Sequence, residues 1–382
     1  MKTAGIVVEY NPMHFGHIHH IEKARELSGC DTLIAVMSGN VVQRGEFSII
    51  DKFTKTKWAL EAGIDLVIEL PAFFSLQSAD MFAKTSVAIL DKLGVDTLVF
   101  GSESGSITKL KMQSELMRTD VYNDSLKKYM TEGYSYPSAS KYALELLSDS
   151  MLIKAPNDIL GIQYLNAIHT LKSPMVAKAI KRLDSGYYGA FNEEFKIQSA
   201  TALRKRLASK KSVKSFVPNF VQTSLETYNH FQTLSNYDDI LSYLLNVHSK
   251  ESLCSIFSFE EGFENLVLKH RHLKTFGPLV NALSSRRYTN ARIKRALMHM
   301  ILDNRKKDDL SFDIPYIRVL GMNDSGRTYL NTIKKTLSVP LITKITRDRH
   351  PLLEMELKVS RIYSLKISQD LFEKEFEPVL IY

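Results

Sequence analysis

The sequence predicts an α/β protein with a parallel sheet, followed by a mostly helical basic region and a small C-terminal α/β unit. Short apolar runs alternate with segments of helical periodicity in the N-terminal part of the chain, as in parallel strands joined by right-handed crossovers. Hydrophobic residues make up 44% and charged residues 24% of the chain, as in globular enzymes. The length of 382 residues predicts two or three domains.

Four strands are expected first, each of them an apolar run that ends at a turn. We place them at 4–10, 32–37, 65–70 and 96–100, connected by helices over 15–28, 51–62 and 78–93. Ligands of parallel sheets bind beyond the carboxyl ends of the strands. The loops after Tyr10, Met37 and Phe100 are therefore expected to form the site.

The remainder of the chain is expected to be mostly helical. A helical insertion at 107–168 precedes a fifth strand at 175–183, and the helical pattern returns over 218–310. Two further strands, at 316–320 and 340–345, flank a helix near 327–337. We therefore divide the chain into domains at 1–210, 211–311 and 312–382.

The cysteine content and the hydropathy exclude several classes of protein. Cys30 and Cys254 lie far apart with no CxxC spacing, so neither a structural zinc site nor a disulfide framework is expected. The N-terminal apolar run is too short for a signal peptide, and no stretch approaches the roughly 18 apolar residues of a membrane span. We expect a cytoplasmic protein with no membrane contact.

The positive charge is concentrated in two windows of the sequence. The chain holds 50 Lys and Arg against 42 Asp and Glu, a net charge of +8. Residues 265–307 hold eleven Lys or Arg and one acid, and residues 198–216 hold six and no acid, so +10 and +6 leave −8 for the remainder. Two basic stretches on a mildly acidic body predict a surface that binds a polyanion. A solvated helical face is the alternative.

The loop after the first strand holds the candidate catalytic residues. His14 and His17 lie three residues apart at a strand-to-helix turn, so their rings can converge, and Gly16 leaves the backbone open to a phosphate. The helix start adds free N–H groups and the positive end of a dipole. This arrangement suits attack on the α-phosphate of a triphosphate. The alternatives are a chance HxGH and a metal cluster that includes His19 and His20 but lacks nearby carboxylate or cysteine ligands.

HxGH in this position resembles the signature of the HIGH nucleotidyltransferase superfamily, which implies a Rossmann-like fold. Longer motifs, which cover most of the chain in order, resemble the bacterial tRNA(Met) cytidine acetate ligase family. Met13 and Phe15 depart from the Phe and Asn expected there. The matching motifs are Glu9-Tyr10-Asn11-Pro12-Met13-His14-Phe15-Gly16-His17, Met37-Ser38-Gly39-Asn40 with Gln43-Arg44-Gly45-Glu46, Val67-Ile68-Glu69-Leu70-Pro71, Phe100-Gly101-Ser102-Glu103, Pro156-Asn157-Asp158-Ile159-Leu160-Gly161 and Arg286-Arg287-Tyr288-Thr289.

The resemblance implies an ATP-dependent ligase with a two-step reaction. Acetate attacks the α-phosphate of ATP to give acetyl-adenylate and pyrophosphate. The N4 amine of the wobble cytidine of elongator tRNA(Met) then takes the acetyl group, giving N4-acetylcytidine. Mg²⁺ is expected with ATP, although the sequence shows no dedicated carboxylate cage for it.

Two other functions stay open from the residues. A small-molecule adenylyltransferase that makes a dinucleotide cofactor would explain HxGH, but it gives the basic helical region no function. An RNA-binding protein with a vestigial nucleotide site would explain the basic stretches but not the retained histidines and Gly16.

By the same resemblance, the ATP site combines residues 7–20, here called the first-loop element, with positions from later segments. Gly101 ends the fourth strand, where a side chain would obstruct a nucleoside, and Arg182 closes the fifth, where a guanidinium can clamp phosphate. Asn157 can read an adenine or ribose edge, or else cap a helix after Pro156. The full set is Val7, Val8, Glu9, Tyr10, Asn11, Pro12, Met13, His14, Phe15, Gly16, His17, Ile18, His19, His20, Gly101, Asn157, Arg182, Ser199, Thr201 and Arg204.

Three members of this set resemble residues at a helix start that bind the β- and γ-phosphates in the superfamily: Ser199, Thr201 and Arg204. Helix capping is the alternative. The loop 37–46 is the expected place for acetate. Arg44 in that loop can neutralise acetate or contact tRNA, and it joins His14 and His17 as a catalytic candidate.

The basic window around residue 290 is expected to bind the tRNA. Its arginines would contact phosphates, and Tyr288 is a candidate stacking ring for a splayed base. The predicted tRNA-binding residues are Arg286, Arg287, Tyr288, Arg292 and Arg295.

Overall fold

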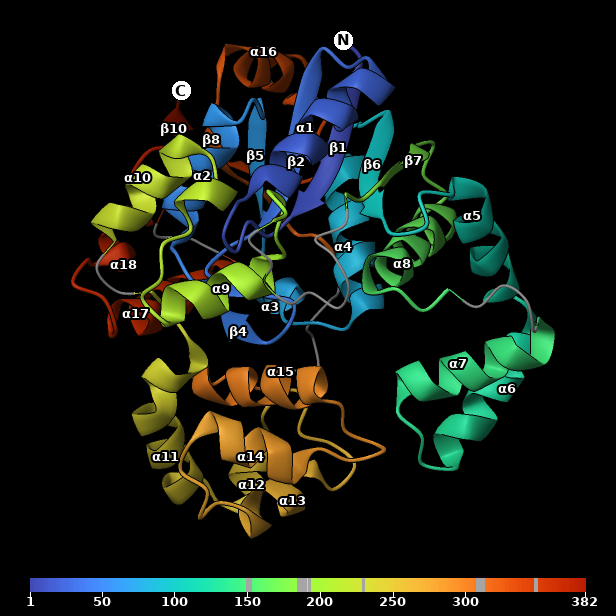
Figure 1. The fold of residues 1–382 in the computed structure, drawn as a ribbon, viewed down its shortest axis with the longest axis vertical. Coiled ribbons are helices and arrows are strands. Elements are labelled where there is room, and N and C mark those ends of the chain that lie inside the picture. Colours follow the sequence, from blue (N-terminus) through green and yellow to red (C-terminus); the bar gives the residue numbers. More distant parts are fainter. Residues whose placement is uncertain (149–152, 184–190, 192–193, 229–230, 307–312, 347–349) are drawn as a thin grey trace.

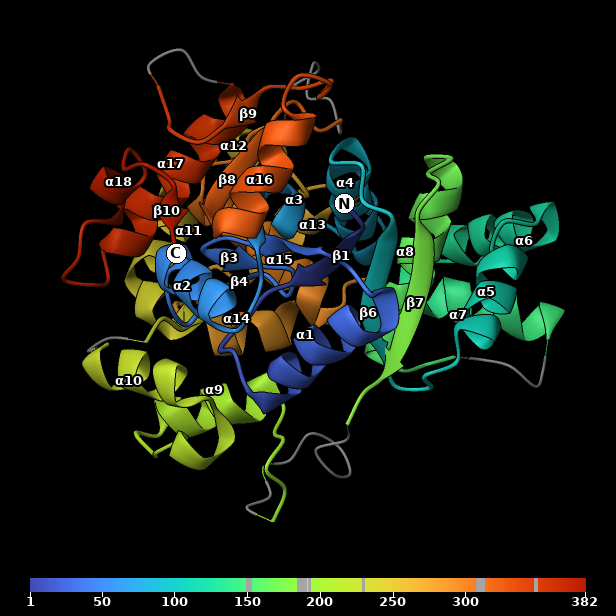
Figure 2. The same ribbon diagram turned by 90° about the horizontal axis from the view of Figure 1, so that it is seen from above.

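The computed structural model describes residues 1–148, 153–183, 191, 194–228, 231–306, 313–346 and 350–382. A central sheet with helices on both faces forms the main body, and two helical parts extend from it (Figures 1 and 2). In the described part of the chain, no helix combines the length and the apolar character that a bilayer span requires.

The sheet has eight strands in the order β10-β8-β5-β2-β1-β6-β7, with β9 paired to β8. The first five strands along the chain in this sheet run parallel and confirm the predicted strands of the N-terminal part. They are β1 (Thr3–Val8), β2 (Thr32–Ser38), β5 (Leu66–Leu70), β6 (Thr97–Ser102) and β7 (Val176–Lys181).

The strands after residue 312 join this same sheet and do not form one of their own. Strand β8 (Ile317–Met322) pairs antiparallel with β5, and β9 (Leu341–Ile342) and β10 (Leu380–Ile381) pair parallel with β8. The expected C-terminal α/β unit is thus an extension of the central sheet. Its strand β8 is buried on both faces, with Val319 in one core and Leu320 in the other, and it covers what would otherwise be the open edge of β5.

Alternation along the strands divides the core into two layers. On β2, Ile34 and Val36 face one side, while Leu33, Ala35 and Met37 face the other. The first side is covered by α4 (Ala79–Lys92), α8 (Pro156–Thr170), α16 (Asp324–Ile333) and α17 (Pro351–Ser364). The second side is covered by α1 (Phe15–Ser28), α2 (Lys52–Glu61), α9 (Ala200–Ala208) and α10 (Asn219–Thr227) (Figure 2).

Two helical parts extend from the sheet, as the sequence predicts for 107–168 and 218–310. An arm leaves the edge near β7 and contains α5 (Ile107–Leu116), α6 (Asp120–Thr131) and α7 (Tyr136–Leu147). A helical lobe, the lower part of Figure 1, contains α11 (Asp238–Val247), α12 (Lys250–Cys254), α13 (Phe263–Lys269), α14 (Phe276–Leu283) and α15 (Asn290–Ile301).

A small hairpin attaches the lobe to the main body. Its strands are β3 (Val41–Val42) and β4 (Glu46–Phe47), and both contribute to the core of the lobe. Helix α17 reaches the same core through Tyr363, whose hydroxyl donates to the Ser48 carbonyl (2.9 Å). The remaining short elements are α3 (Ala72–Ser75), α18 (Leu371–Lys374) and the 3-10 turns Lys214–Phe216 and Leu234–Tyr237.

A buried ionic cluster ties the C-terminal segment to the sheet. Lys52 of α2 lies 2.6 Å from Glu69 of β5 and 2.8 Å from Glu375. Arg318 of β8 contacts the same two carboxylates at 2.9 and 2.6 Å. Glu356 of α17 completes the cluster and accepts from the backbone N–H of Ala72. All five side chains are buried.

Candidate nucleotide site

The order of the strands places a binding site at the carboxyl ends of β1 and β6. From β1 the chain builds outward to β2 and β5, and then continues on the other side of β1 with β6 and β7. Strand β1 pairs with β2 along its whole length, through Val8, but with β6 only at Ala4 and Gly5. The carboxyl halves of β1 and β6 are therefore unpaired with each other. Such a reversal of strand order is where doubly wound sheets bind nucleotides.

His14 and His17 meet at this point because they cap helix α1. His14 is the N-cap residue, and its Nδ1 accepts from the backbone N–H of Gly16 (3.0 Å). In return, His17 Nδ1 accepts from the backbone N–H of His14 (3.2 Å). The two rings lie 3.9 Å apart, centroid to centroid, with a tilt of 31°. A Cβ at Gly16 would come within 2.8 Å of the His14 ring, so glycine permits this capping geometry.

Burial sets the protonation state of both rings, and the capping contacts set which nitrogen carries the proton. Burial, reinforced by Arg182, lowers the pKa of His14 to about 3. Burial and the neighbouring His14 lower the pKa of His17 well below its ordinary value. Both imidazoles are therefore neutral at pH 7. Because each Nδ1 accepts a hydrogen bond, each proton sits on Nε2, which is left as a donor.

The loop that carries the histidines is held from three sides. Buried Lys55 of α2 donates to the carbonyl oxygens of Glu9 (3.0 Å), Ser38 (2.7 Å) and Gly39 (2.7 Å). Asn11 Oδ1 accepts from the Ile49 N–H (2.7 Å), and the Asn11 carbonyl accepts from Arg204 of α9 (2.7 Å). Burial lowers the pKa of Lys55 to about 7, although Glu9 and Asp51 oppose this shift. No motif or spacing in the sequence marks Lys55 for this place.

The flanking residues of the first-loop element take different positions. Tyr10 adopts a left-handed backbone conformation (φ 48°). Its ring and that of His17 lie 5.0 Å apart, centroid to centroid, in an edge-to-face arrangement. The Phe15 ring lies 4.4 Å from the ammonium of Lys196. Burial lowers the pKa of His20 to about 4. Val8 and Met13 are core residues, so any contact they make with a ligand would come from the backbone.

Arg182, Asn157 and Gly101 converge beside the histidines. The Arg182 guanidinium donates to Asn157 Oδ1 (3.5 Å), and its side chain covers Gly101, where a Cβ would lie 3.3 Å away. Asn157 donates to Glu103 Oε1 (2.5 Å), and Glu103 also accepts from the backbone N–H of Asp158 (2.9 Å). The carboxylate of Glu103, rather than Asn157, therefore caps α8. This result excludes the capping alternative for Asn157.

Helix α9 brings three predicted phosphate-binding residues to the loop. Ser199 is the N-cap of α9, and its hydroxyl accepts from the Ala202 N–H (3.1 Å), as the capping alternative predicts. Arg204 donates to Thr201 Oγ1 (3.3 Å) as well as to Asn11. Burial lowers the pKa of Arg204, although Glu46 and Glu9 oppose this effect.

Arg44 lies in the exposed turn of the hairpin, while the first half of its loop is buried. Ser38, Gly39 and Asn40, all expected near acetate, face the interior, and the Asn40 amide donates to Ser360 of α17 (3.1 Å). The buried ionic cluster and Lys55 lie against this part of the loop. The place of acetate in the loop stays a prediction. In the part of the chain that is described, Arg44 has no carboxylate within ion-pair distance.

The predicted tRNA-binding residues do not form one exposed surface. The Tyr288 ring is buried, packs on Phe263, and its hydroxyl donates to the Glu261 carbonyl (2.8 Å). The prediction of an exposed stacking ring is therefore wrong for Tyr288, because the core of the lobe encloses it. Arg287 and Arg292 both pair with the Glu261 carboxylate, at 3.2 and 3.1 Å.

The other two arginines make contacts outside the lobe. Arg295 is half-buried against the hairpin and donates to the Gln43 carbonyl (3.4 Å), and burial lowers its pKa to about 10. Arg286 is exposed and lies over the Tyr134 ring of the arm, 3.1 Å from its centroid. The Arg286 carbonyl also accepts from the Ser135 N–H (3.1 Å). The loop before α15 thus touches the tip of the arm.

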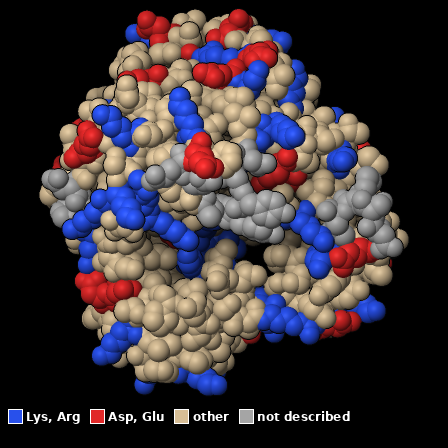
Figure 3. All heavy atoms as spheres, in the orientation of Figure 1, with Lys and Arg blue, Asp and Glu red and all other residues tan. Residues whose placement is uncertain are grey.

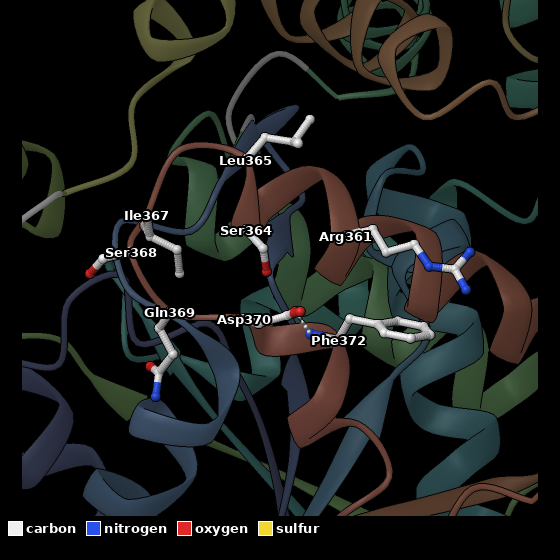
Figure 4. A pocket seen from close by; sticks show the side chains of 8 residues that line it. All are labelled: Arg361, Ser364, Leu365, Ile367, Ser368, Gln369, Asp370 and Phe372. Atoms are coloured by element: carbon white, nitrogen blue, oxygen red, sulfur yellow. Dashed lines mark hydrogen bonds between the residues drawn. The ribbon is translucent and has the colours of Figure 1, made fainter.

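A surface hollow of about 400 Å³ lies elsewhere, between α17 and α18 (Figure 4). Asp370 accepts from the Phe372 N–H (2.8 Å), and Arg361 lies over the Phe372 ring at 4.1 Å. The first contact caps α18, and the second joins α17 to α18. Neither helix contributes a residue to the carboxyl ends of β1 and β6, so this hollow is separate from the candidate site.

Comparison with known proteins identifies the class. The HIGH Nucleotidyl Transferase family model matches residues 1–376, and the chain belongs to this family. It is 38% identical to the tRNA(Met) cytidine acetate ligase of Bacillus subtilis (strain 168), covering 97% of this chain and 94% of that protein. It is 37% identical to the protein of the same name from Caldanaerobacter subterraneus subsp. tengcongensis, covering 96% and 95%.

Solved structures agree with this assignment. The crystal structure of Thermotoga maritima TmcAL in its apo form I matches with a TM-score of 0.90 and 29% identity over 100% of both chains. The form II structure, bound with alpha-thio ATP, matches with a TM-score of 0.88 at the same identity and coverage. The predicted α/β nucleotidyltransferase fold and the family resemblance are confirmed.

Proposed function

We propose that the protein is an ATP-dependent ligase that activates acetate as acetyl-adenylate and acetylates the N4 amine of wobble cytidine 34 in elongator tRNA(Met). One observation carries this proposal: two neutral histidines cap helix α1 at the reversal of strand order. The relatives that are named for this activity match the chain over nearly their whole length.

In the first step, His14 and His17 act as hydrogen-bond donors to the phosphates of ATP. Each presents an Nε2–H whose direction is set by the cap at Nδ1, so little reorganisation is needed as charge grows on the α-phosphate. Arg182 and Arg204 lie on either side of this element and add positive charge for the departing pyrophosphate. Arg44 is the cation proposed for acetate.

In the second step, the cytidine N4 amine attacks the acetyl carbonyl. The bond between the acetyl carbon and the phosphate oxygen breaks, AMP leaves, and the amine loses a proton. No covalent bond to the enzyme is required. The residues of the site then serve to hold the adenylate and to neutralise the phosphate of AMP as it leaves.

Mg²⁺ would reach the site mainly through the phosphates of ATP. Within the described ranges, no group of three or more His, Cys, Asp or Glu residues could hold a metal ion. Two nearby carboxylates already have partners, since Glu9 accepts from the Gln43 N–H (2.8 Å) and Glu46 accepts from Lys294 (2.5 Å). The described residues therefore supply no cage for Mg²⁺.

The deciding experiment is mass analysis of the tRNA product. Purified protein is incubated with elongator tRNA(Met), ATP, Mg²⁺ and isotope-labelled acetate, and the tRNA is digested and analysed. We expect the label on cytidine 34 only when ATP is present. The control is the same tRNA with uridine at position 34, which lacks the N4 amine and is expected to take no label.

Two other outcomes would point to other functions. If no tRNA is labelled, but pyrophosphate is released with a mononucleotide as second substrate, the protein is a small-molecule adenylyltransferase. If tRNA binds and ATP is not consumed under any condition, the protein is an RNA-binding protein that has lost its nucleotide chemistry.

A further inference from the structure

We propose that a group of exposed lysines, on helix α9 and in the segment that follows it, binds the RNA phosphate backbone. This lysine stripe consists of Lys205, Lys210, Lys211 and Lys214, and all four side chains are exposed. The inference rests on the proposed function, because it assigns a place to the RNA substrate. It differs from the expectation for α15, which put the RNA contacts on the helical lobe.

The lysines of the stripe lack acidic partners. In the ranges that the structure describes, no carboxylate lies within ion-pair distance of any of the four. On α15 and the loop before it, by contrast, Arg287 and Arg292 share Glu261, and Lys294 lies 2.5 Å from Glu46. A cation that is already paired gains less from a phosphate, because it must first give up its carboxylate.

The lysine stripe also lies close to the candidate nucleotide site. Helix α9 begins with Ser199 and Thr201 beside the loop that carries His14 and His17, and Arg204 donates to Asn11 in that loop. At a rise of about 1.5 Å per residue, Ala208, the last residue of α9, lies about 6 Å beyond Arg204 along the axis, and Lys210 follows it by two residues. An RNA whose acceptor base enters the site has backbone phosphates within this range.

The surface agrees with this placement. Figure 3 shows Lys and Arg side chains gathered over the region of α9 and along the rim of a hollow between the main body and the helical lobe, with few acids among them. The sequence window 198–216 likewise contains no acidic residue. A polyanion is the partner whose charge complements this surface.

The segment that bears the lysines is held in place by its own packing. Val213 and Phe216 are buried in the core beneath α1 and α10. Arg206 donates to the Ser212 carbonyl of this segment (2.6 Å) and lies 4.4 Å from the centroid of the Phe191 ring. The lysines are therefore presented by a fixed backbone, which reduces the ordering needed when RNA binds.

One lysine occupies a position that favours glycine. Lys210 follows the C-cap of α9 with φ 55°, in the left-handed region. Glycine is the usual residue there, because it adopts this conformation without strain. The substitution Lys210→Gly therefore removes a charge of the stripe while relieving the backbone, and it should not unfold the protein.

The test compares three variants for their affinity for elongator tRNA(Met) as a function of KCl concentration. The stripe variant carries Gln at Lys205, Lys210, Lys211 and Lys214. A matched control carries Gln at four exposed lysines remote from the site, Lys2, Lys334, Lys335 and Lys344. A third variant carries Gln at the paired arginines Arg287 and Arg292. Filter binding gives the Kd, and thermal melting shows that each variant is folded.

The stripe variant is expected to weaken tRNA binding at least tenfold at 150 mM KCl. Each lost phosphate contact lowers the slope of log K against log salt by about 0.7 to 0.9, so four contacts lower it by about 3. Lys210→Gly alone should lower the slope by about 1. The matched control should keep the wild-type slope, and the arginine variant should lose less than the stripe variant.

An unchanged slope in the stripe variant, or a larger loss in the arginine variant, would overturn the inference. Acetate-dependent ATP–pyrophosphate exchange, measured without RNA, separates this result from the proposed function. If the wild-type protein shows exchange but the stripe variant keeps its RNA affinity, only the stripe is wrong. If the wild-type protein shows no exchange with acetate, the ligase proposal fails whatever the stripe does.

Discussion

At the scale of single residues, His14 has two tasks that can be separated. It caps helix α1 through Nδ1 and presents Nε2–H to the site. Asparagine is a strong N-cap residue but carries no imidazole. We expect His14→Asn to stay folded and to lose about 10²- to 10³-fold in acetate-dependent ATP–pyrophosphate exchange, the usual effect of removing one preorganised donor. Full activity in this variant would show that the ring is needed only as a cap.

The same residue makes stability depend on pH. Burial lowers the pKa of His14 to about 3 in the folded protein, against an ordinary value near 6.5 in the unfolded chain. Between these values only the unfolded chain binds the proton, so stability falls as pH falls. At pH 5.5 the loss from His14 is about 1.4 kcal/mol relative to pH 7.5.

Urea unfolding of wild type and His14→Asn at both pH values measures this loss. The difference in unfolding free energy between the two proteins should shift by about 1.4 kcal/mol in favour of the variant on going to pH 5.5. A difference that is independent of pH would mean that His14 can take up a proton in the folded state.

Sequence alone placed the histidines but not their chemistry. The HxGH spacing after an apolar strand located the site, because strand ends and helix starts are local features. The neutral state and the tautomer of His14 and His17 depend on burial and on capping contacts that no spacing reveals. The same limit explains Lys55 and Tyr288, whose surroundings come from segments distant in sequence.

At the scale of elements, the hairpin β3–β4 is fixed against helix α15. Gly45 in its turn has φ 75°, and a Cβ there would lie 2.4 Å from the backbone nitrogen of Arg295. We expect Gly45→Ala to push the hairpin off α15, to destabilise the protein by about 2 kcal/mol and to raise the KM for acetate, since Arg44 sits in the same turn.

Gly63→Ala is the matched control for this effect. Gly63 also has a positive φ, of 96°, but no atom lies within 4 Å of the position that a Cβ would take there. It therefore reports the backbone strain without the contact. If both variants raise the KM for acetate equally, the hairpin does not position the acetate site.

Elements were predictable where their pattern is long. The helix at Phe15–Ser28 and the strand at Thr32–Ser38 follow directly from apolar periodicity, and α2, which Asp51 caps, lies within the predicted range 51–62. The hairpin strands escaped prediction because each has two residues, too few to show alternation. The sequence also could not indicate that β8 would pair with β5, since pairing between strands so far apart is decided by the assembled core.

At the scale of the whole molecule, the buried ionic cluster joins the first and last parts of the chain. Burial, with Glu69 next, raises the pKa of Glu356 well above its ordinary value, which favours the neutral form of this carboxyl. Lys52 and Arg318 then balance Glu69 and Glu375, two charges against two. The C-terminal segment is thereby held to β5 and α2 through charges that have no access to water.

Removing Lys52 from this cluster leaves two buried carboxylates, Glu69 and Glu375, with Arg318 as their shared cation, so one negative charge is no longer balanced. We expect Lys52→Met to destabilise the protein by about 3 to 5 kcal/mol, measured by urea unfolding at pH 7, because such a charge cannot be solvated where it lies. Lys57→Met, on the same helix but exposed, is the control and should change stability by less than about 0.5 kcal/mol. A loss below about 1 kcal/mol for Lys52→Met would mean that a second carboxyl takes up a proton in the variant. In that case the C-terminal strands are held to the sheet by apolar packing rather than by charge.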